Sequence, residues 1–293
     1  MSHPAARRAL LALIVASFLF GATFVVIKSA LDDIDPISFV AWRFLIGALA
    51  AMAIAFPKGR QIWRDGAITG LALFGGYALQ TSGLAVTSAS NSALITGMYV
   101  VLTPLLAALM KRRPPNPWVL AAAAASFAGL FLLTDTDGLT LSQGDLLTLG
   151  CAFAFAFHIL ALARYAQRHP IVPYTAVQLL VVAVLAFPVA ALTGGVELPP
   201  TSVWPALAIT GFVVGIGAFM LQVWAQTVVG PSTAAIILAA EPAFGVATAW
   251  VVLDERLDGA GWAGTALVVF AIFLVVTRQT EDTASAEAVT PAH

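Results

Sequence analysis

Charged residues are scarce in this sequence. Only 10% of its 293 residues are Asp, Glu, Lys or Arg, whereas a typical soluble domain carries about 25%. Hydrophobic residues make up 60% of the chain. A chain with so little polar surface cannot cover itself in water, although its length alone would allow one or two soluble domains. We therefore exclude a soluble protein and predict a chain that crosses a membrane many times.

Signatures of several other protein classes are missing too. The single cysteine, Cys151, cannot form an internal disulfide. The sequence has no phosphate-binding loop, and Gly215-Ile216-Gly217 does not extend into a dinucleotide fingerprint. It has no cysteine–histidine cluster, so we predict neither a cofactor nor a metal site. The 14 basic and 15 acidic residues nearly cancel, and this balance offers no basic surface for a nucleic acid.

Apolar runs dominate what remains. A membrane-spanning helix needs about 20 mostly apolar residues to cross ~30 Å of hydrocarbon, and polar or proline-containing breaks separate ten such runs. The first follows Arg7-Arg8 but has no convincing cleavage site, so we expect a retained helix and not a signal peptide. Residues 279–293 are polar and small and predict a disordered tail. The spans are expected near residues 9–30, 36–56, 66–86, 91–110, 117–134, 145–163, 171–192, 202–225, 233–253 and 260–277.

The basic residues predict the orientation, because Lys and Arg close to span ends stay on the cytoplasmic side. If the N-terminus is cytoplasmic, the cytoplasmic segments hold 11 of the 14 basic residues. The reverse orientation would place two there. We therefore expect both termini in the cytoplasm and the acidic Asp135–Asp137 loop outside. The 11 residues are Arg7, Arg8, Lys58, Arg60, Arg64, Lys111, Arg112, Arg113, Arg164, Arg168 and Arg278.

The two halves of the chain repeat weakly. Gly75–Gln80 matches Gly217–Gln222 at an offset of 142, and Phe127–Thr134 matches Phe270–Thr277 at an offset of 143. Ten spans divide into five and five, with halves at residues 8–135 and 144–278. Because five is odd, the second half enters the membrane from the opposite side. The fold class predicted is an all-α membrane protein with two inverted five-helix repeats, which places a substrate site at the midplane between them.

Short motifs in the spans carry a family resemblance. They are Phe20–Phe24, Ala41–Phe44, Thr103–Leu105, Glu241–Phe244 and Leu253–Leu257. Over residues 8–278 the chain resembles the drug/metabolite transporter superfamily, and within it the EamA-type exporters. The resemblance implies a ten-helix transporter with a central cavity lined by both halves. It implies no single substrate, because the substrates of the family range widely.

Polar groups inside the spans are candidates for function, since each is costly in hydrocarbon. Glu241 lies mid-span and must be protonated, paired or in contact with water, and Pro242 after it predicts a kinked or unwound helix. Arg43 is either an anchor for a substrate carboxylate or for Glu241, or a residue that snorkels to the interface. His158 is either a proton relay or substrate contact, or a hydrogen-bonding partner between helices.

Four further residues complete the candidate substrate or coupling site. Gln80 and Gln222 occupy matching repeat positions and suit a polar substrate at the midplane, with helix-to-helix hydrogen bonding as the alternative. Tyr99 and Trp224 offer aromatic faces to a cavity, although aromatic residues in helices are more often packing or interfacial residues.

These observations predict a secondary transporter, which uses no ATP and exports a small metabolite by alternating access. One cation, one carboxylate, glutamines and aromatics suit a zwitterion with an apolar side chain, such as an amino acid. The expected partners are this small molecule and the lipid bilayer, with the protein in the plasma (bacterial inner) membrane. The alternative is a membrane-embedded enzyme, which would depend on Glu241 and His158. Coupling to protons, the direction of transport and the oligomeric state stay open.

Overall fold

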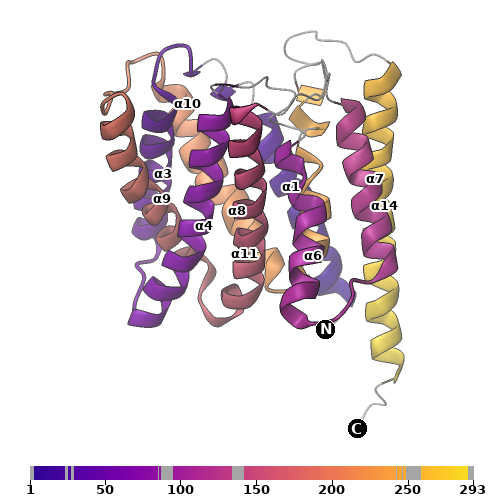
Figure 1. Ribbon diagram of the computed structural model, residues 1–293. Helices are drawn as coiled ribbons and strands as arrows, with labels where there is room; N and C mark the ends of the chain where they lie inside the picture. Colours follow the sequence, from indigo (N-terminus) through magenta and orange to yellow (C-terminus); the bar gives the residue numbers. More distant parts are fainter. Residues whose placement is uncertain are drawn as a thin grey trace.

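The computed structural model describes residues 3–23, 26–27, 30–84, 86, 95–133, 142–241, 243–245, 247–248 and 259–289. For residues 3, 84, 133, 275–276 and 279–289 it describes the backbone alone. The regular elements in these segments are all helices, which run side by side in one bundle (Figure 1). α1 begins and α14 ends at the same end of this bundle, as an even number of crossings requires.

The helices form two sets of five spans. The first set is α1 (His3–Ala22), α3 (Pro36–Ile54), α4 (Arg60–Leu84), α6 (Tyr99–Lys111) and α7 (Pro117–Leu133). The second set is α8 (Gln143–Tyr165), α9 (Ile171–Thr193), a continuous rod of α10 (Trp204–Ala208), the π helix η2 (Ile209–Ala218) and α11 (Phe219–Gln226), then α12 (Pro231–Leu238) and α14 (Gly259–Val289). A short 3₁₀ turn, η1 (Ala166–Arg168), follows α8.

Length and composition fit a membrane. Within the described residues, five helices are long and apolar enough to cross it, at 4–22, 36–54, 143–168, 171–193 and 204–226. Three shorter apolar helices lie at 95–111, 117–132 and 259–274. Side chains such as Leu109, Leu192 and Phe273 are 74%, 87% and 64% exposed, which hydrocarbon tolerates and water does not. The predicted all-α membrane fold is confirmed.

Local chemistry fixes several helix ends. α3 starts at Pro36, which needs no hydrogen-bond acceptor for a backbone N–H, and the Asp35 carboxylate accepts from the Ser38 N–H at 2.7 Å. α8 starts with a capping box between Ser142 and Asp145. At the far end, α14 continues to Val289, whereas the sequence predicts disorder from residue 279. Alanine and glutamate are frequent in 279–289 and favour helix.

The helix contacts relate the two halves as a two-fold axis would. Three interfaces join equivalent spans: α3 packs on α9, α6 on α12 and α7 on α14. Further interfaces form matched pairs, since α4 packs on α8 as α1 packs on α11, and α4 packs on α9 as α3 packs on η2. Matched aromatic contacts follow, with Phe20 against Phe219 at 5.1 Å and Phe155 against Tyr77 at 5.5 Å between ring centroids.

Several features predicted from the sequence lie outside the described residues. These are the Asp135–Asp137 loop, Pro242, the Leu253–Leu257 motif and the end of the predicted span 233–253. The ninth span is described as α12 and as residues 239–241, 243–245 and 247–248, so Glu241 is the last residue described before the proline.

Candidate functional site

The backbone is irregular just before Glu241. α12 ends at Leu238, and Ala239 and Ala240 form a turn. In an α-helix the Leu238 carbonyl would accept from the N–H of residue 242, but a proline has none. The buried Ser17 hydroxyl of α1 donates to this carbonyl instead, at 3.2 Å. A side chain of the first span therefore satisfies the carbonyl that Pro242 leaves free.

A glycine lets α1 approach this point closely. A Cβ atom added to Gly21 would collide with the Glu241 carbonyl oxygen and would lie 2.9 Å from the Gly245 nitrogen. Ser17 is one helical turn before Gly21, so both face the ninth span. The first and ninth spans thus hold the backbone that carries the Glu241 side chain.

The Glu241 side chain lies inside the bundle, where protein atoms surround it, yet it stays partly accessible to solvent. Arg43, on α3, is 6% exposed, and its guanidinium lies 4.8 Å and 5.0 Å from the ring centroids of Phe44 and Tyr77. Arg43 and Glu241 attract one another electrostatically. Among the described ion pairs, however, none within 4.0 Å joins these two residues. The opposite charges are neighbours without direct contact.

Uncharged polar groups complete this region. Tyr77, Tyr99 and Cys151 lie within electrostatic range of Glu241. Gln80 donates to the Thr96 hydroxyl at 3.5 Å, and that hydroxyl lies 3.8 Å from the Cys151 sulfur. We call this set the central polar cluster, and both halves contribute to it. Its members are Arg43, Tyr77, Gln80, Thr96, Tyr99, Cys151 and Glu241.

Aromatic rings line the cluster. Phe219 contacts Phe44 at 5.9 Å, Phe44 contacts Tyr77 at 4.9 Å, and Phe155 contacts Tyr99 at 6.4 Å between ring centroids. With the Tyr77–Phe155 contact, the rings run without a break from α11 through α3, α4 and α8 to α6. The cluster therefore combines one cation, one carboxylate, hydrogen-bonding groups and apolar ring faces.

A second group of polar side chains lies between α8, α9 and α11, and it adjoins the rings that line the cluster, since the His158 ring packs against Phe219 at 6.5 Å between ring centroids. His158 is 2% exposed, and its Nε2 lies 3.1 Å from the Gln178 Oε1. Gln222 is 4% exposed and donates to the Gln226 Oε1 at 3.3 Å, while Gln226 donates to the Ile159 carbonyl at 2.9 Å. Two of these bonds join helices, since His158–Gln178 links α8 to α9 and Gln226–Ile159 links α11 to α8, whereas Gln222–Gln226 lies within α11. The buried amides are therefore satisfied.

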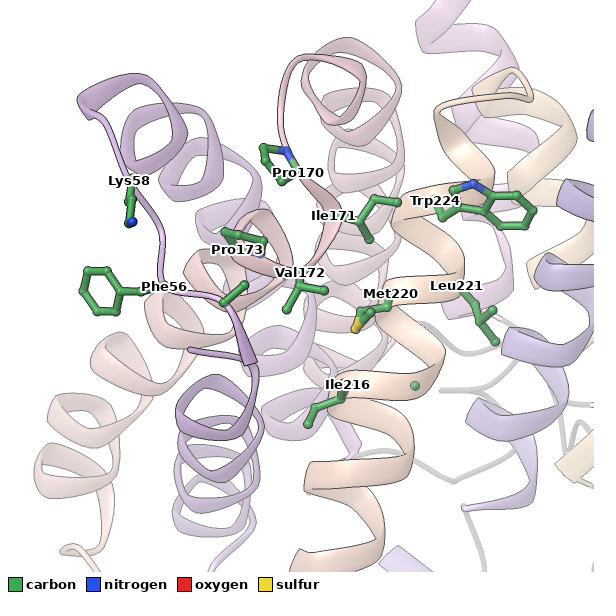
Figure 2. Close-up of a pocket in the computed structure, with 12 residues that line it drawn as sticks. Phe56, Lys58, Pro170, Ile171, Val172, Pro173, Ile216, Met220, Leu221 and Trp224 are labelled. Carbon is green, nitrogen blue, oxygen red and sulfur yellow. The ribbon is translucent and has the colours of Figure 1, made fainter. Parts of the chain in front are cut away.

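The candidates predicted from the sequence thus fall in three places. Arg43, Glu241, Gln80 and Tyr99 belong to the central polar cluster, whereas His158 and Gln222 belong to the second group. Trp224 lies in neither, because it lines an open groove beside α11 (Figure 2).

The sequence did not single out Thr96 or Cys151 as site residues, nor Gln178 and Gln226 as partners. Tyr77 was visible from the sequence, as a neighbour of Gln80 in the repeated Gly75–Gln80 segment. The signal for Gln178 and Gln226 was their amide groups within apolar spans. Thr96 and Cys151 gave no such signal, because small polar residues are common in membrane helices.

Comparisons with known proteins identify the family and the fold. The model of the EamA-like transporter family matches twice, over residues 7–135 and 142–277. An uncharacterized transporter of Archaeoglobus fulgidus is 32% identical over 268 residues, which are 92% of this chain and 85% of the relative. The uncharacterized transporter YwfM of Bacillus subtilis is 25% identical over 94% of this chain and 95% of its own.

A solved crystal structure shares the fold. It is 23% identical, covers 93% of this chain and 98% of its own, and superposes with a TM-score of 0.78. The family match covers nearly the whole chain as two units, in line with the paired helix contacts. The apolar spans indicate an integral, multi-pass membrane protein, and the family match and the relatives indicate a transporter. The chain belongs to the EamA-like transporter family.

Proposed function

We propose that the protein is a secondary transporter that exports a small zwitterionic metabolite, such as an amino acid with an apolar side chain. One observation carries the proposal: a cation from the first half, Arg43, and a carboxylate from the second half, Glu241, lie inside the bundle near each other without direct contact. A zwitterion fits between such charges, with its carboxylate toward Arg43 and its ammonium toward Glu241. The aromatic rings beside them suit the apolar side chain.

The mechanism that we infer is alternating access around the central polar cluster. Binding residues drawn from both halves allow one half to move against the other while the site stays between them. Glu241, the partly accessible carboxylate, binds the substrate ammonium or carries a coupling proton. Gln80 and Tyr99 hydrogen-bond the substrate, whereas His158 holds α8 to α9. Gln222 orients Gln226, which bonds to α8, and Trp224 lies outside the pathway.

The alternative reading, a membrane-embedded enzyme, gains less support. It needs Glu241 and His158 to act together on one substrate. The structure places His158 against Gln178 in the second group, and Glu241 in the central polar cluster. We therefore assign no residue a catalytic role.

We place the protein in the plasma membrane with both termini cytoplasmic, because of the distribution of its basic residues. Leu198 is 80% exposed in the loop after α9, and Lys111 is exposed at the opposite end of the bundle. In intact cells, an impermeant maleimide should label Leu198→Cys but should label Lys111→Cys only after permeabilisation. The native Cys151 is buried and does not interfere. The reverse pattern would overturn the orientation and the direction of export.

The test of function is transport by purified protein in proteoliposomes, with a panel of amino acids and with or without a pH gradient. We expect transport of at least one apolar amino acid and a loss of about tenfold or more in Glu241→Gln, in keeping with the loss of a buried charge contact. Glu197→Gln is the matched control, since its carboxylate lies in an exposed loop and accepts from the Asp35 N–H at 2.7 Å. Equal transport by both variants would remove Glu241 from the mechanism.

The same assay separates the two roles of Glu241. If this residue carries the coupling proton, Glu241→Gln should lose accumulation driven by a pH gradient but keep exchange at equal pH. If it only binds the substrate ammonium, both activities should fall together. If the wild-type protein transports no amino acid of the panel, charged and polar ones included, the proposed substrate class is wrong.

A further inference from the structure

An open groove on the outside of the bundle is not used by the proposed transport site. Its volume is about 1,090 Å³, and Figure 2 shows its walls. One wall is the end of α3 with the loop after it, another is the start of α9, and the third is the rod of η2 and α11. The side chains that line the groove include Phe56, Lys58, Ile171, Met220, Leu221 and Trp224.

The long wall of this groove is an apolar helix face. Residues 216, 217, 220, 221 and 224 are partly exposed, while residues 218, 219, 222 and 223 between them are buried in the bundle. From Ile216 to Trp224 the wall is about 12 Å long at 1.5 Å per residue. One leaflet contributes about half of the ~30 Å hydrocarbon thickness, so the groove has nearly the depth of a leaflet.

Charge marks one end of the groove. Lys58 is exposed and is the charged residue among those that line it. Arg60, at the start of α4, is also exposed. This end of the bundle carries α1's first residue and α14's last (Figure 1), and basic residues there attract anionic headgroups. Trp224 lies toward the same end, and tryptophan suits the level of the headgroups.

We propose that this groove binds an anionic phospholipid, with one acyl chain along α11 and the headgroup phosphate at Lys58. The apolar length fits a chain within one leaflet, and the charge at its end fits a phosphate. A zwitterionic lipid of the same chain length satisfies the groove but brings an ammonium group toward Lys58. The groove thus binds phosphatidylglycerol more tightly than phosphatidylcholine.

Native mass spectrometry of the purified full chain tests the headgroup, with phosphatidylglycerol and phosphatidylcholine of identical acyl chains. We expect wild-type protein to retain phosphatidylglycerol preferentially, and Lys58→Glu to lose roughly fivefold or more of that preference, since one basic residue near a membrane surface contributes about a fivefold factor. Lys111→Glu is the matched control, because it removes a basic residue at the same end but outside the groove. Lys58→Gln, a milder change, should lose part of the preference.

Fluorescence quenching tests the chain. Phosphatidylglycerol brominated in its acyl chains should quench wild-type tryptophan fluorescence more than that of Trp224→Phe, and phosphatidylcholine with the same chains should show a smaller difference. An unchanged lipid preference in Lys58→Glu, an equal loss in Lys111→Glu, or identical quenching without Trp224 would each overturn the proposal. A lipid-free dimer that Trp224→Phe dissociates would assign the groove to a second copy of the chain. None of these outcomes depends on transport, so they leave the proposed function untouched.

Discussion

The two halves of the transporter treat one motif differently. In the first half, Thr103 precedes Pro104, is fully buried and donates to the Tyr99 carbonyl of its own helix at 2.7 Å. α6 runs through this proline to Lys111. In the second half, α12 ends at Leu238, before the residue that corresponds to Thr103, which is Glu241. Pro104 therefore lies inside a continuous helix. Pro242 follows a break in its helix, where the Ser17 hydroxyl donates to the Leu238 carbonyl.

A second pair of equivalent helices, α3 and α9, also differs, in this case in the polar side chain that each one carries. α3 carries Arg43, which reaches the central polar cluster, whereas α9 carries Gln178, which hydrogen-bonds His158 at 3.1 Å. One half thus brings a charge to the cluster from α3, and the other half brings a charge from the ninth span. The repeat supplies a symmetrical frame, and the departures from symmetry supply the chemistry.

The largest effect is expected from breaking the charge pair that this asymmetry creates. Arg43→Gln leaves Glu241 without its cation, and Glu241→Gln leaves Arg43 without its anion. Removing one partner of a buried pair costs about 3–5 kcal/mol, and we expect the lower end because these charges are not in direct contact. The double variant should recover much of the lost stability but no transport. The melting temperature in detergent and uptake into proteoliposomes measure the two effects.

A double variant that is no more stable than the single variants would show that the two charges are stabilised independently. Equal loss of stability in Gln178→Ala and in Arg43→Gln would remove the distinction between the two halves.

The sequence predicted the frame better than the site. Apolar runs mark spans because backbone groups in hydrocarbon must be satisfied within the helix, and charges within those runs stand out, so Arg43 and Glu241 were found. The pair Gln80 and Gln222 shows the limit. Matching positions in a repeat are equivalent by symmetry, but they lie close together only near the axis. The structure places Gln80 beside Thr96 and Gln222 beside Gln226.

The approach of α1 to the broken span gives the next prediction. Gly21→Ala places a Cβ against the Glu241 carbonyl, which must shift. Overpacking of this kind typically costs about 1–3 kcal/mol, and transport should fall with it because the backbone of Glu241 moves. Gly217→Ala is the control, since its added Cβ would meet Leu19 Cδ1 at 4.0 Å, an ordinary van der Waals contact. The melting temperature and the transport rate of Gly217→Ala should both stay near those of the wild type. Equal effects of the two substitutions would contradict the close contact at Gly21.

The carbonyl freed by Pro242 allows a comparison between two buried serines. Ser17→Ala removes the donor to the Leu238 carbonyl and should cost about 1–3 kcal/mol, because a buried acceptor loses its partner. Ser126→Ala should be neutral or slightly stabilising, since the buried Ser126 hydroxyl has no hydrogen-bond partner within the described structure. Thermal melting of both variants measures the difference. A loss in Ser17→Ala no larger than that in Ser126→Ala would show that the break before Glu241 does not depend on this hydrogen bond from α1.

The smallest effects are expected from the two glutamines, and they sharpen the comparison between the halves. Gln80 is partly exposed within the central polar cluster and makes a long hydrogen bond of 3.5 Å, so Gln80→Ala should weaken transport a few-fold and leave stability nearly unchanged. Gln222 is 4% exposed and bonded to Gln226 one turn later in α11, so Gln222→Ala should cost about 0.5–1.5 kcal/mol, the net contribution of a typical hydrogen bond, with substrate affinity retained. Because the residues act in different places, the changes in transport should add in the double variant. Strong non-additivity would instead mean that both amides contact one substrate, and the site would then extend from Glu241 across to α11.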